Sequence, residues 1–197
     1  MPLYFETISG PCEKDPEAAR AWQPEVTVFA TDPAASMRSL NRLFAVGAEA
    51  GGIRSMEAID IAHLGGTQTV GAKVCFVDGR PFKAAYRRYR IRTADNDDFQ
   101  SMREVVLRGY ADAGAGTAIF PDMVLIDGGQ GQLGAALQAF GAMAHQPPLV
   151  VALAKKEELL WVQDRAEPLK LGRNNPALRL CQAIRDEAHR FAGHYHA

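Results

Sequence analysis

Three strand-like segments follow one another between residues 54 and 92, and only after them do helices and strands alternate. The segments read RSMEAIDIAH, QTVGAKVCFVDG and RPFKAAYRRYRIR, and the last two meet at Asp78-Gly79, a dipeptide typical of tight hairpins. A helix over about residues 97–110, with Asp97 or Asp98 as its cap, is expected next. A strand, a helix, a strand, a short hairpin and a closing helix follow. This order predicts an α/β fold with a mixed sheet flanked by helices.

Residues 1–52 are expected to form an N-terminal arm and a linking helix in front of a domain over residues 53–197. Prolines interrupt the first thirty or so residues, which have weak periodicity. Asp32 and Pro33 are a favourable cap and first position for the linking helix, and the Gly-Gly pair at 51–52 would close it. The chain length of 197 residues suits one sizeable domain with a small appendage.

Composition excludes several classes of protein. The net charge of −1 gives no overall attraction to nucleic acid or membrane, so a site for a polyanion would need a local cluster of basic residues. No segment resembles a signal peptide, and no apolar run approaches the roughly 18 residues of a membrane span. Three cysteines without a C-x-x-C pair argue against a zinc site and a disulfide framework. A reducing cytoplasm is the expected location.

The segment LIDGGQGQLG, residues 125–134, follows a strand-like run and precedes a helix-like run. Gly129, Gly131 and Gly134 have the G-x-G-x-x-G spacing of a dinucleotide-binding loop. Such a site uses the first strand of its fold and has no carboxylate where the pyrophosphate lies, whereas this strand is the fourth and ends in Asp127. The segment GGTQTVGAK also lacks the G-K-[ST] core of a P-loop. Nucleotide binding is therefore kept only as a third hypothesis.

Two aspartates interrupt or end apolar, strand-like runs. Asp60 lies inside MEAIDIAH, and Asp127 ends MVLID. A buried carboxylate is costly unless it is paired or binds a metal ion. Two carboxylates on adjacent strands would converge on a divalent cation, which can polarise a phosphoryl oxygen or generate hydroxide from water. Structural alternatives remain open, because Asp60 could cap a neighbouring loop and Asp127 could be a turn residue before Gly128.

A basic segment could bring a polyanion to such a site. Alternation in KAAYRRYRIR places Arg88, Arg90 and Arg92 on one face of the expected strand, with Tyr86 beside them. Arginines with an aromatic residue among them suit phosphate contacts. The same pattern is also typical of a solvent-exposed edge strand whose charges prevent aggregation.

The closing helix contributes the main histidine candidate. It has Asn175 as its expected cap, an apolar stripe on one face, and His189 one turn after Arg185 on a flanking face. Histidine titrates near neutral pH and could act as a general acid or base, although a lone helical histidine is often a surface residue. His63 and His145, in or near expected loops, and the two histidines of the tail are weaker candidates.

The motifs taken together resemble a known family. In order and spacing, six segments look like the C-terminal endonuclease domain of the excinuclease subunit UvrC. They are IDIAH, QTVGAKVCFVDGRPFKAAYRRYRI, DDFQSMREVVLRGY, PDMVLIDGGQGQL, LAK and RLCQAIRDEAHRFA. The similarity runs from about Arg54 to Tyr195. It implies a ribonuclease H-like fold and metal-dependent cutting of damaged DNA on the 5' side of a lesion, during nucleotide excision repair.

The resemblance also implies a cofactor, partners and residue roles. Manganese or magnesium is the expected cofactor and damaged duplex DNA the expected substrate. UvrB is a possible partner, although the segment that binds UvrB has no counterpart in this chain. Asp60, Asp127 and His189 match the family's catalytic triad, with the two aspartates as metal ligands, and Asp98 matches a further required aspartate. The expected DNA contacts, from the resemblance and the arginine row together, are Arg87, Arg88, Arg90, Lys155 and Gln130.

The chain departs from the family pattern at three positions. Ile59 and Ala62 stand where the family usually has Phe and Ser, and Gln130 stands where it usually has Lys. Loss of that lysine removes a positive charge beside the metal and could weaken DNA binding or transition-state stabilisation. The first hypothesis is therefore a metal-dependent DNA endonuclease, and the second is a non-catalytic nucleic-acid-binding or scaffold module on the same fold.

Overall fold

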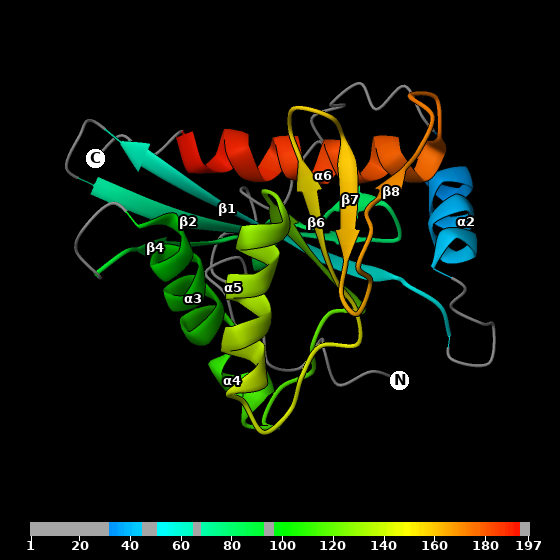
Figure 1. Cartoon of the computed structure of the whole chain (residues 1–197). Coiled ribbons are helices and arrows are strands. Elements are labelled where there is room, and N and C mark those ends of the chain that lie inside the picture. The colour runs from blue at the N-terminus through cyan, green and yellow to red at the C-terminus, as the bar shows by residue number, and fades with distance from the viewer. Residues whose placement is uncertain (1–31, 45–50, 65–67, 93–96, 194–197) are drawn as a thin grey trace, which may run out of the picture. The chain divides into compact units, whose positions relative to one another are not determined.

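A computed structural model describes residues 32–44, 51–64, 68–92 and 97–193 of the chain (Figure 1). Residues 31–197 form one compact unit. The expected N-terminal arm and the histidines of the C-terminal tail lie outside the described residues. The expected division between residues 52 and 53 stays a prediction.

A mixed sheet of eight strands forms the centre of this unit. The order is β3-β2-β1-β5-β6-β7-β8, and β4 pairs with the edge of β2 that also carries β3. β1, β5 and β6 run parallel to one another, and the other pairs are antiparallel. The predicted mixed α/β fold is confirmed. The strands are β1 (Ser55–Leu64), β2 (Gln68–Val77), β3 (Arg80–Pro81), β4 (Arg87–Arg90), β5 (Met123–Asp127), β6 (Val150–Ala154), β7 (Leu159–Val162) and β8 (Leu169–Lys170).

Helices cover both faces of the sheet. α3 and α5 pack side by side on one face, while α6 crosses the other face and is contacted by α2 (Figure 1). In the part of the chain that the structure describes, no helix is long and apolar enough to cross a membrane. The helices are α2 (Pro33–Leu43), α3 (Asp98–Gly109), α4 (Ala111–Gly114), α5 (Gln130–Gly141) and α6 (Pro176–Gly193).

The predicted helix starts are confirmed by side-chain caps. The carboxylate of Asp32 accepts a hydrogen bond from the backbone N–H of Ala34 at the start of α2. Asp97, rather than Asp98, caps α3, and Asn175 caps α6. Such caps satisfy backbone donors that have no partner inside the helix, each contributing roughly 1 kcal/mol. The caps therefore fix where α3 and α6 begin.

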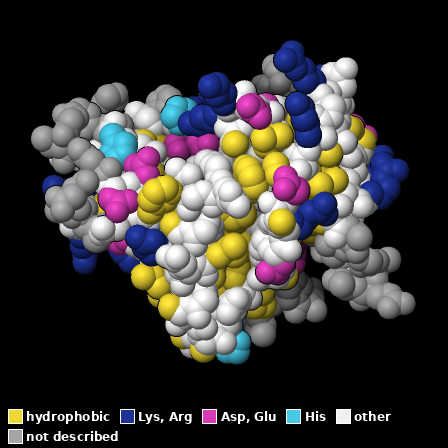
Figure 2. Space-filling view, in the orientation of Figure 1, with side chains coloured by type: hydrophobic (Ala, Val, Ile, Leu, Met, Phe, Trp, Pro, Cys, Tyr) yellow, Lys and Arg dark blue, Asp and Glu magenta, His cyan; other side chains and the backbone are white. Residues whose placement is uncertain are grey.

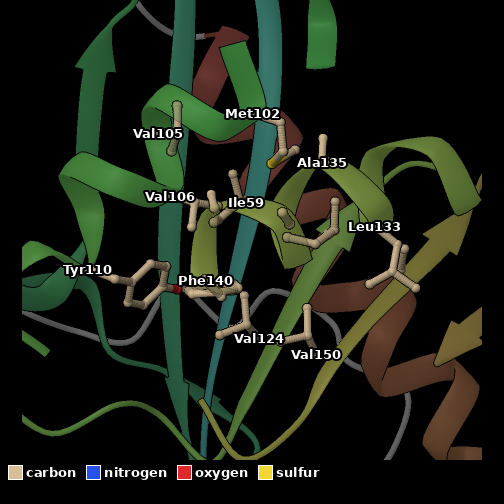
Figure 3. Close-up of a cluster of buried hydrophobic side chains, with 14 residues drawn as sticks. Ile59, Met102, Val105, Val106, Tyr110, Val124, Leu133, Ala135, Phe140 and Val150 are labelled. Carbon is tan, nitrogen blue, oxygen red and sulfur yellow. The ribbon is translucent and has the colours of Figure 1, made fainter. Parts of the chain in front are cut away.

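Apolar side chains from β1, β5 and β6 fill the space beneath α3 and α5 (Figure 3). Ile59 of β1 and Ile126 of β5 belong to this cluster and are paired across the two parallel strands. Gly71 of β2 lets α3 approach closely, because a Cβ there would lie 2.1 Å from Cγ2 of Val105. Since side chains alternate along a strand, the residues next to Ile59 and Ile126 face α6 instead.

Two sequence predictions need correction. The segment 80–92 is not one strand: β3 ends at Pro81, a 3-10 helix (Lys83–Ala85) follows, and β4 begins only at Arg87. The N–H of Phe82 still donates to the carbonyl of Cys75, and the 3-10 helix then interrupts the pairing with β2. Helix α2 ends at Leu43 instead of reaching the glycine pair at 51–52.

Candidate metal centre

Two buried carboxylates lie next to each other on the α6 face of the sheet. Asp60 of β1 and Asp127 of β5 each follow the paired isoleucines Ile59 and Ile126 by one residue, so both side chains alternate to the same face. Asp60 is 4% exposed and Asp127 is 9% exposed. The expectation that the two acids lie on adjacent strands is confirmed by this register.

Helix α6 brings His189 to the two acids. Its Nδ1 lies 2.9 Å from Oδ2 of Asp60, while the His189 side chain as a whole is 62% exposed. One ligand atom from each of Asp60, Asp127 and His189 falls within 4.8 Å of the other two. The structure therefore brings together the three residues that the sequence singled out, although 129 positions separate Asp60 from His189.

The carboxylate of Asp127 is incompletely satisfied by the protein. Nζ of Lys155 lies 3.0 Å from Oδ2, and among the described residues no donor makes a hydrogen bond to Oδ1. Burial, and next the negative charge of Asp60, raise the pKa of Asp127 to about 6, and Lys155 opposes that rise. Two buried acids at this distance repel each other unless a cation lies between them.

The donor set fits a divalent cation. Asp60 and Asp127 offer carboxylate oxygens, the ligands preferred by magnesium and manganese, and His189 offers a ring nitrogen. A cavity of about 350 Å³ opens beside the acids, and Asp98, Gly128 and Lys156 are among the residues that line it. The site thus has both a place for a cation and room for a ligand on it.

Asp98 lies at the rim of this cavity, at the first position of α3. Its Oδ1 is 2.7 Å from Nε2 of His63, and Nδ1 of His63 is 2.9 Å from the hydroxyl of Thr69. Asp98 is therefore held by the β1–β2 hairpin and is no helix cap. The expected loop at His63 is wrong, because β1 extends to Leu64 and includes this histidine. The available signal was strand alternation, which places His63 on the same face as Ile59 and Ile61, the face that α3 covers.

The predicted arginine row is only partly formed. β4 ends at Arg90, so the row does not extend to Arg92. The Arg88 guanidinium donates two hydrogen bonds to the carbonyl of Phe191 and lies 3.8 Å from the centre of that ring. Arg87 donates to the carbonyls of Ala84 and Tyr86. Arg88 thus holds the last turn of α6, two residues beyond His189, and contact of Arg87, Arg88 or Arg90 with DNA stays a prediction.

The glycine segment forms a tight turn and the first turns of α5. Gly128 has a φ of 152°, which few other residues adopt, and Gly131 and Gly134 lie inside the helix. The helix therefore begins at Gln130, earlier than the run after residue 134 suggested. The Gln130 side chain is exposed, and the side chain of Gln132 accepts a hydrogen bond from the N–H of Gly129. Sequence reasoning missed Gln132 and Lys156, both of which line the cavity.

Comparison with known proteins identifies the family. The family model of the UvrC RNAse H endonuclease domain matches residues 49–192. The chain is 42% identical over 147 residues to UvrABC system protein C of Dehalococcoides mccartyi, and 46% identical over 147 residues to that of Moorella thermoacetica. These matches cover 72% and 73% of this chain.

The chain spans about a quarter of the length of these relatives, 24% in both cases. Among solved structures, it has a distant likeness to Ciona intestinalis Endonuclease V in complex with DNA. That likeness has a TM-score of 0.41 and 9% identity, and covers 71% of this chain and 84% of the other. Because the family match covers β1 to α6 with every residue of the acidic cluster, the chain belongs to the UvrC RNase H endonuclease domain family.

Proposed function

We propose that this domain cuts a DNA phosphodiester with a divalent cation held by Asp60 and Asp127, as in the incision step of nucleotide excision repair. The observation that carries the proposal is the pair of buried carboxylates whose charge the protein only partly balances. Membership of an endonuclease domain family supports the same reaction. The cation, manganese or magnesium, would stabilise charge on the phosphoryl oxygens and lower the pKa of a bound water.

His189 is the residue we assign to proton transfer. Its Nδ1 is occupied by Asp60, so Nε2 is the nitrogen that can hold or move a proton at the attacking water or the leaving oxygen. The contact with Asp60 also fixes the orientation of the ring. In this scheme Asp60 serves both as a metal ligand and as the group that orients the histidine.

The cavity supplies basic residues for the DNA backbone. Lys155 and Lys156 line it beside Asp127, and the Lys155 side chain is 56% exposed. Lys155 can therefore leave Asp127 for a phosphate once a cation balances the two acids. We place the exposed Arg90 and Gln130 at the edges of the DNA path. In the full repair system the substrate would be damaged duplex DNA, and UvrB a possible partner.

The test is a nicking assay with manganese or magnesium, on lesion-bearing and undamaged duplexes. Asp60→Asn, Asp127→Asn and His189→Asn should each lower the rate about 100-fold or more, since each removes a group that acts on the reacting atoms. Arg165→Ala, a change at an exposed residue after β7, is the matched control and should cut normally. Equal, metal-independent traces of product from wild type and all three variants, with DNA still bound, would instead support a non-catalytic DNA-binding module.

A further inference from the structure

An exposed aromatic ring lies beside the candidate metal centre. Phe99 is the second residue of α3 and directly follows Asp98, which lines the cavity. Its side chain is 44% exposed, although phenyl rings are more often buried. Its backbone N–H donates to the Asp97 carboxylate, which fixes this turn of the helix. Figure 2 shows hydrophobic and acidic side chains next to one another over this end of α3.

The Phe99 ring packs against a glycine of the neighbouring helix α5. A Cβ on Gly131 would lie 2.8 Å from Cε1 and 3.0 Å from Cζ of Phe99, closer than side chains tolerate. Gly131 belongs to the first turn of α5, between Gly129 and Gln132, which both line the cavity. The ring tip therefore rests on the α5 backbone at the edge of the cavity, and glycine at this position is what permits it.

We propose that Phe99 is a stacking platform for a nucleobase adjacent to the phosphodiester at the Asp60–Asp127 centre. This inference rests on the proposed function, because the centre must hold a nucleic-acid phosphate. Aromatic side chains next to a basic backbone path commonly stack on bases, and every base offers such a face. Lys155 and Lys156 provide that basic path on the other side of the cavity. Stacking there orients the nucleotide without reading its sequence, as a repair enzyme requires.

Two other exposed apolar side chains do not share these features. Leu107 lies on the same helix and is 45% exposed, and Ile119 is 55% exposed. Neither is adjacent in sequence to a residue that lines the cavity, as Phe99 is to Asp98. Leu107 is thus a matched control for loss of exposed apolar surface from α3.

The experiment removes the base and the ring separately. Duplexes carry one abasic residue at each position around the incision point, and their cutting is measured with wild type, Phe99→Ala, Phe99→Trp and Leu107→Ala. On intact DNA we expect Phe99→Ala to raise KM roughly 5- to 100-fold. Phe99→Trp and Leu107→Ala should have a KM near that of wild type. At one position, the abasic residue should raise the KM of wild type about as much as Phe99→Ala does on intact DNA. The same abasic residue should leave the KM of Phe99→Ala unchanged.

Gly131→Ala, which would push the ring aside, should reproduce the Phe99→Ala pattern. A 2-aminopurine at the sensitive position reports stacking through fluorescence quenching even if cutting is slow. Two results would overturn the stacking site: a Phe99→Ala variant that behaves like Leu107→Ala on intact DNA, or one whose loss adds to that of the abasic residue at every position. In both cases, incision by wild type would still support the proposed function. A wild-type chain that neither binds nor cuts DNA overturns both. Loss of binding to another protein alone, with normal DNA handling, would reassign Phe99 to a protein interface.

Discussion

Strand β1 contains two buried acids, Glu57 and Asp60, whose charges are balanced differently within the protein. Glu57 is paired inside the fold: Nζ of Lys73 on β2 lies 3.0 Å from its Oε2, donates to the carbonyl of Gly109, and lies 4.6 Å from the centre of the Tyr110 ring. Asp60, three residues later, lies beside a second acid instead. His189 is 2.9 Å from Asp60, and Lys155 is 3.0 Å from Asp127.

This difference distinguishes Glu57, whose charge is part of the folded core, from the acids of the candidate metal centre. The charge of Glu57 is balanced one to one by Lys73 within the protein. The Asp60–Asp127 cluster has an excess of negative charge in a buried place, a cost that folding alone does not offset. A buried acid pair whose two charges face a single lysine is therefore a site prepared for an external cation, whereas a buried acid as such is not.

The largest effect should come from breaking the internal pair. Lys73→Met leaves the Glu57 carboxylate buried without its partner, and we expect it to lower the free energy of unfolding by about 3–5 kcal/mol. Urea denaturation measures this loss. The double variant Glu57→Gln/Lys73→Met should recover most of it. A loss below about 1 kcal/mol in the single variant would show that water or another group balances Glu57.

Neutralising an acid of the cluster should have the opposite sign. Because burial and the charge of Asp60 raise the Asp127 pKa from 3.8 to about 6, Asp127→Asn should stabilise the metal-free protein at pH 7.5, by up to about 3 kcal/mol. The same variant should lose the thermal stabilisation that manganese gives to wild type. Thermal unfolding with and without manganese tests both parts. A metal-free Asp127→Asn protein that is less stable than wild type would contradict the assignment of unbalanced charge.

The pH dependence of metal binding is expected to follow Asp127. An acid whose folded pKa is raised stabilises the fold below its unfolded pKa, and this contribution is lost as the pH rises from about 4 to about 6. Metal needs the ionised carboxylate, so manganese affinity should fall by up to about tenfold per pH unit below pH 6. Titration calorimetry at several pH values between 5 and 7.5 measures the slope. An affinity that is unchanged across this range would exclude Asp127 as a ligand.

The smallest effect should come from a pair on the surface. Arg54 and Asp78 form a bidentate ion pair beside the β2–β3 turn, with more than half of each side chain exposed. The hydrogen bond from Arg54 lowers the pKa of Asp78, so Asp78→Asn should destabilise the fold slightly, by less than about 1 kcal/mol, and only above the pKa. High salt should erase the difference in urea denaturation. A loss above about 1 kcal/mol would contradict a solvent-screened pair, because asparagine also adopts the positive φ found at this position.

The sequence by itself determined the order of elements and the identity of the acids. Helix caps at Asp97 and Asn175 and the turn at Asp78-Gly79 are local signals, because each acts on the backbone within three residues. Asp60 and Asp127 were visible because a carboxylate interrupts an otherwise apolar strand. The resemblance that linked them to His189 depended on these same motifs.

Only the tertiary structure decided what each polar side chain contacts. Three such contacts join residues that are 16 to 103 positions apart. Lys73 pairs with Glu57, Arg88 donates to the carbonyl of Phe191, and His63 contacts Asp98. Local periodicity carries no information on such distances, because register and helix placement follow from the packing of the whole core. The sequence shows which charges are costly, and the fold decides which of them are balanced within the protein.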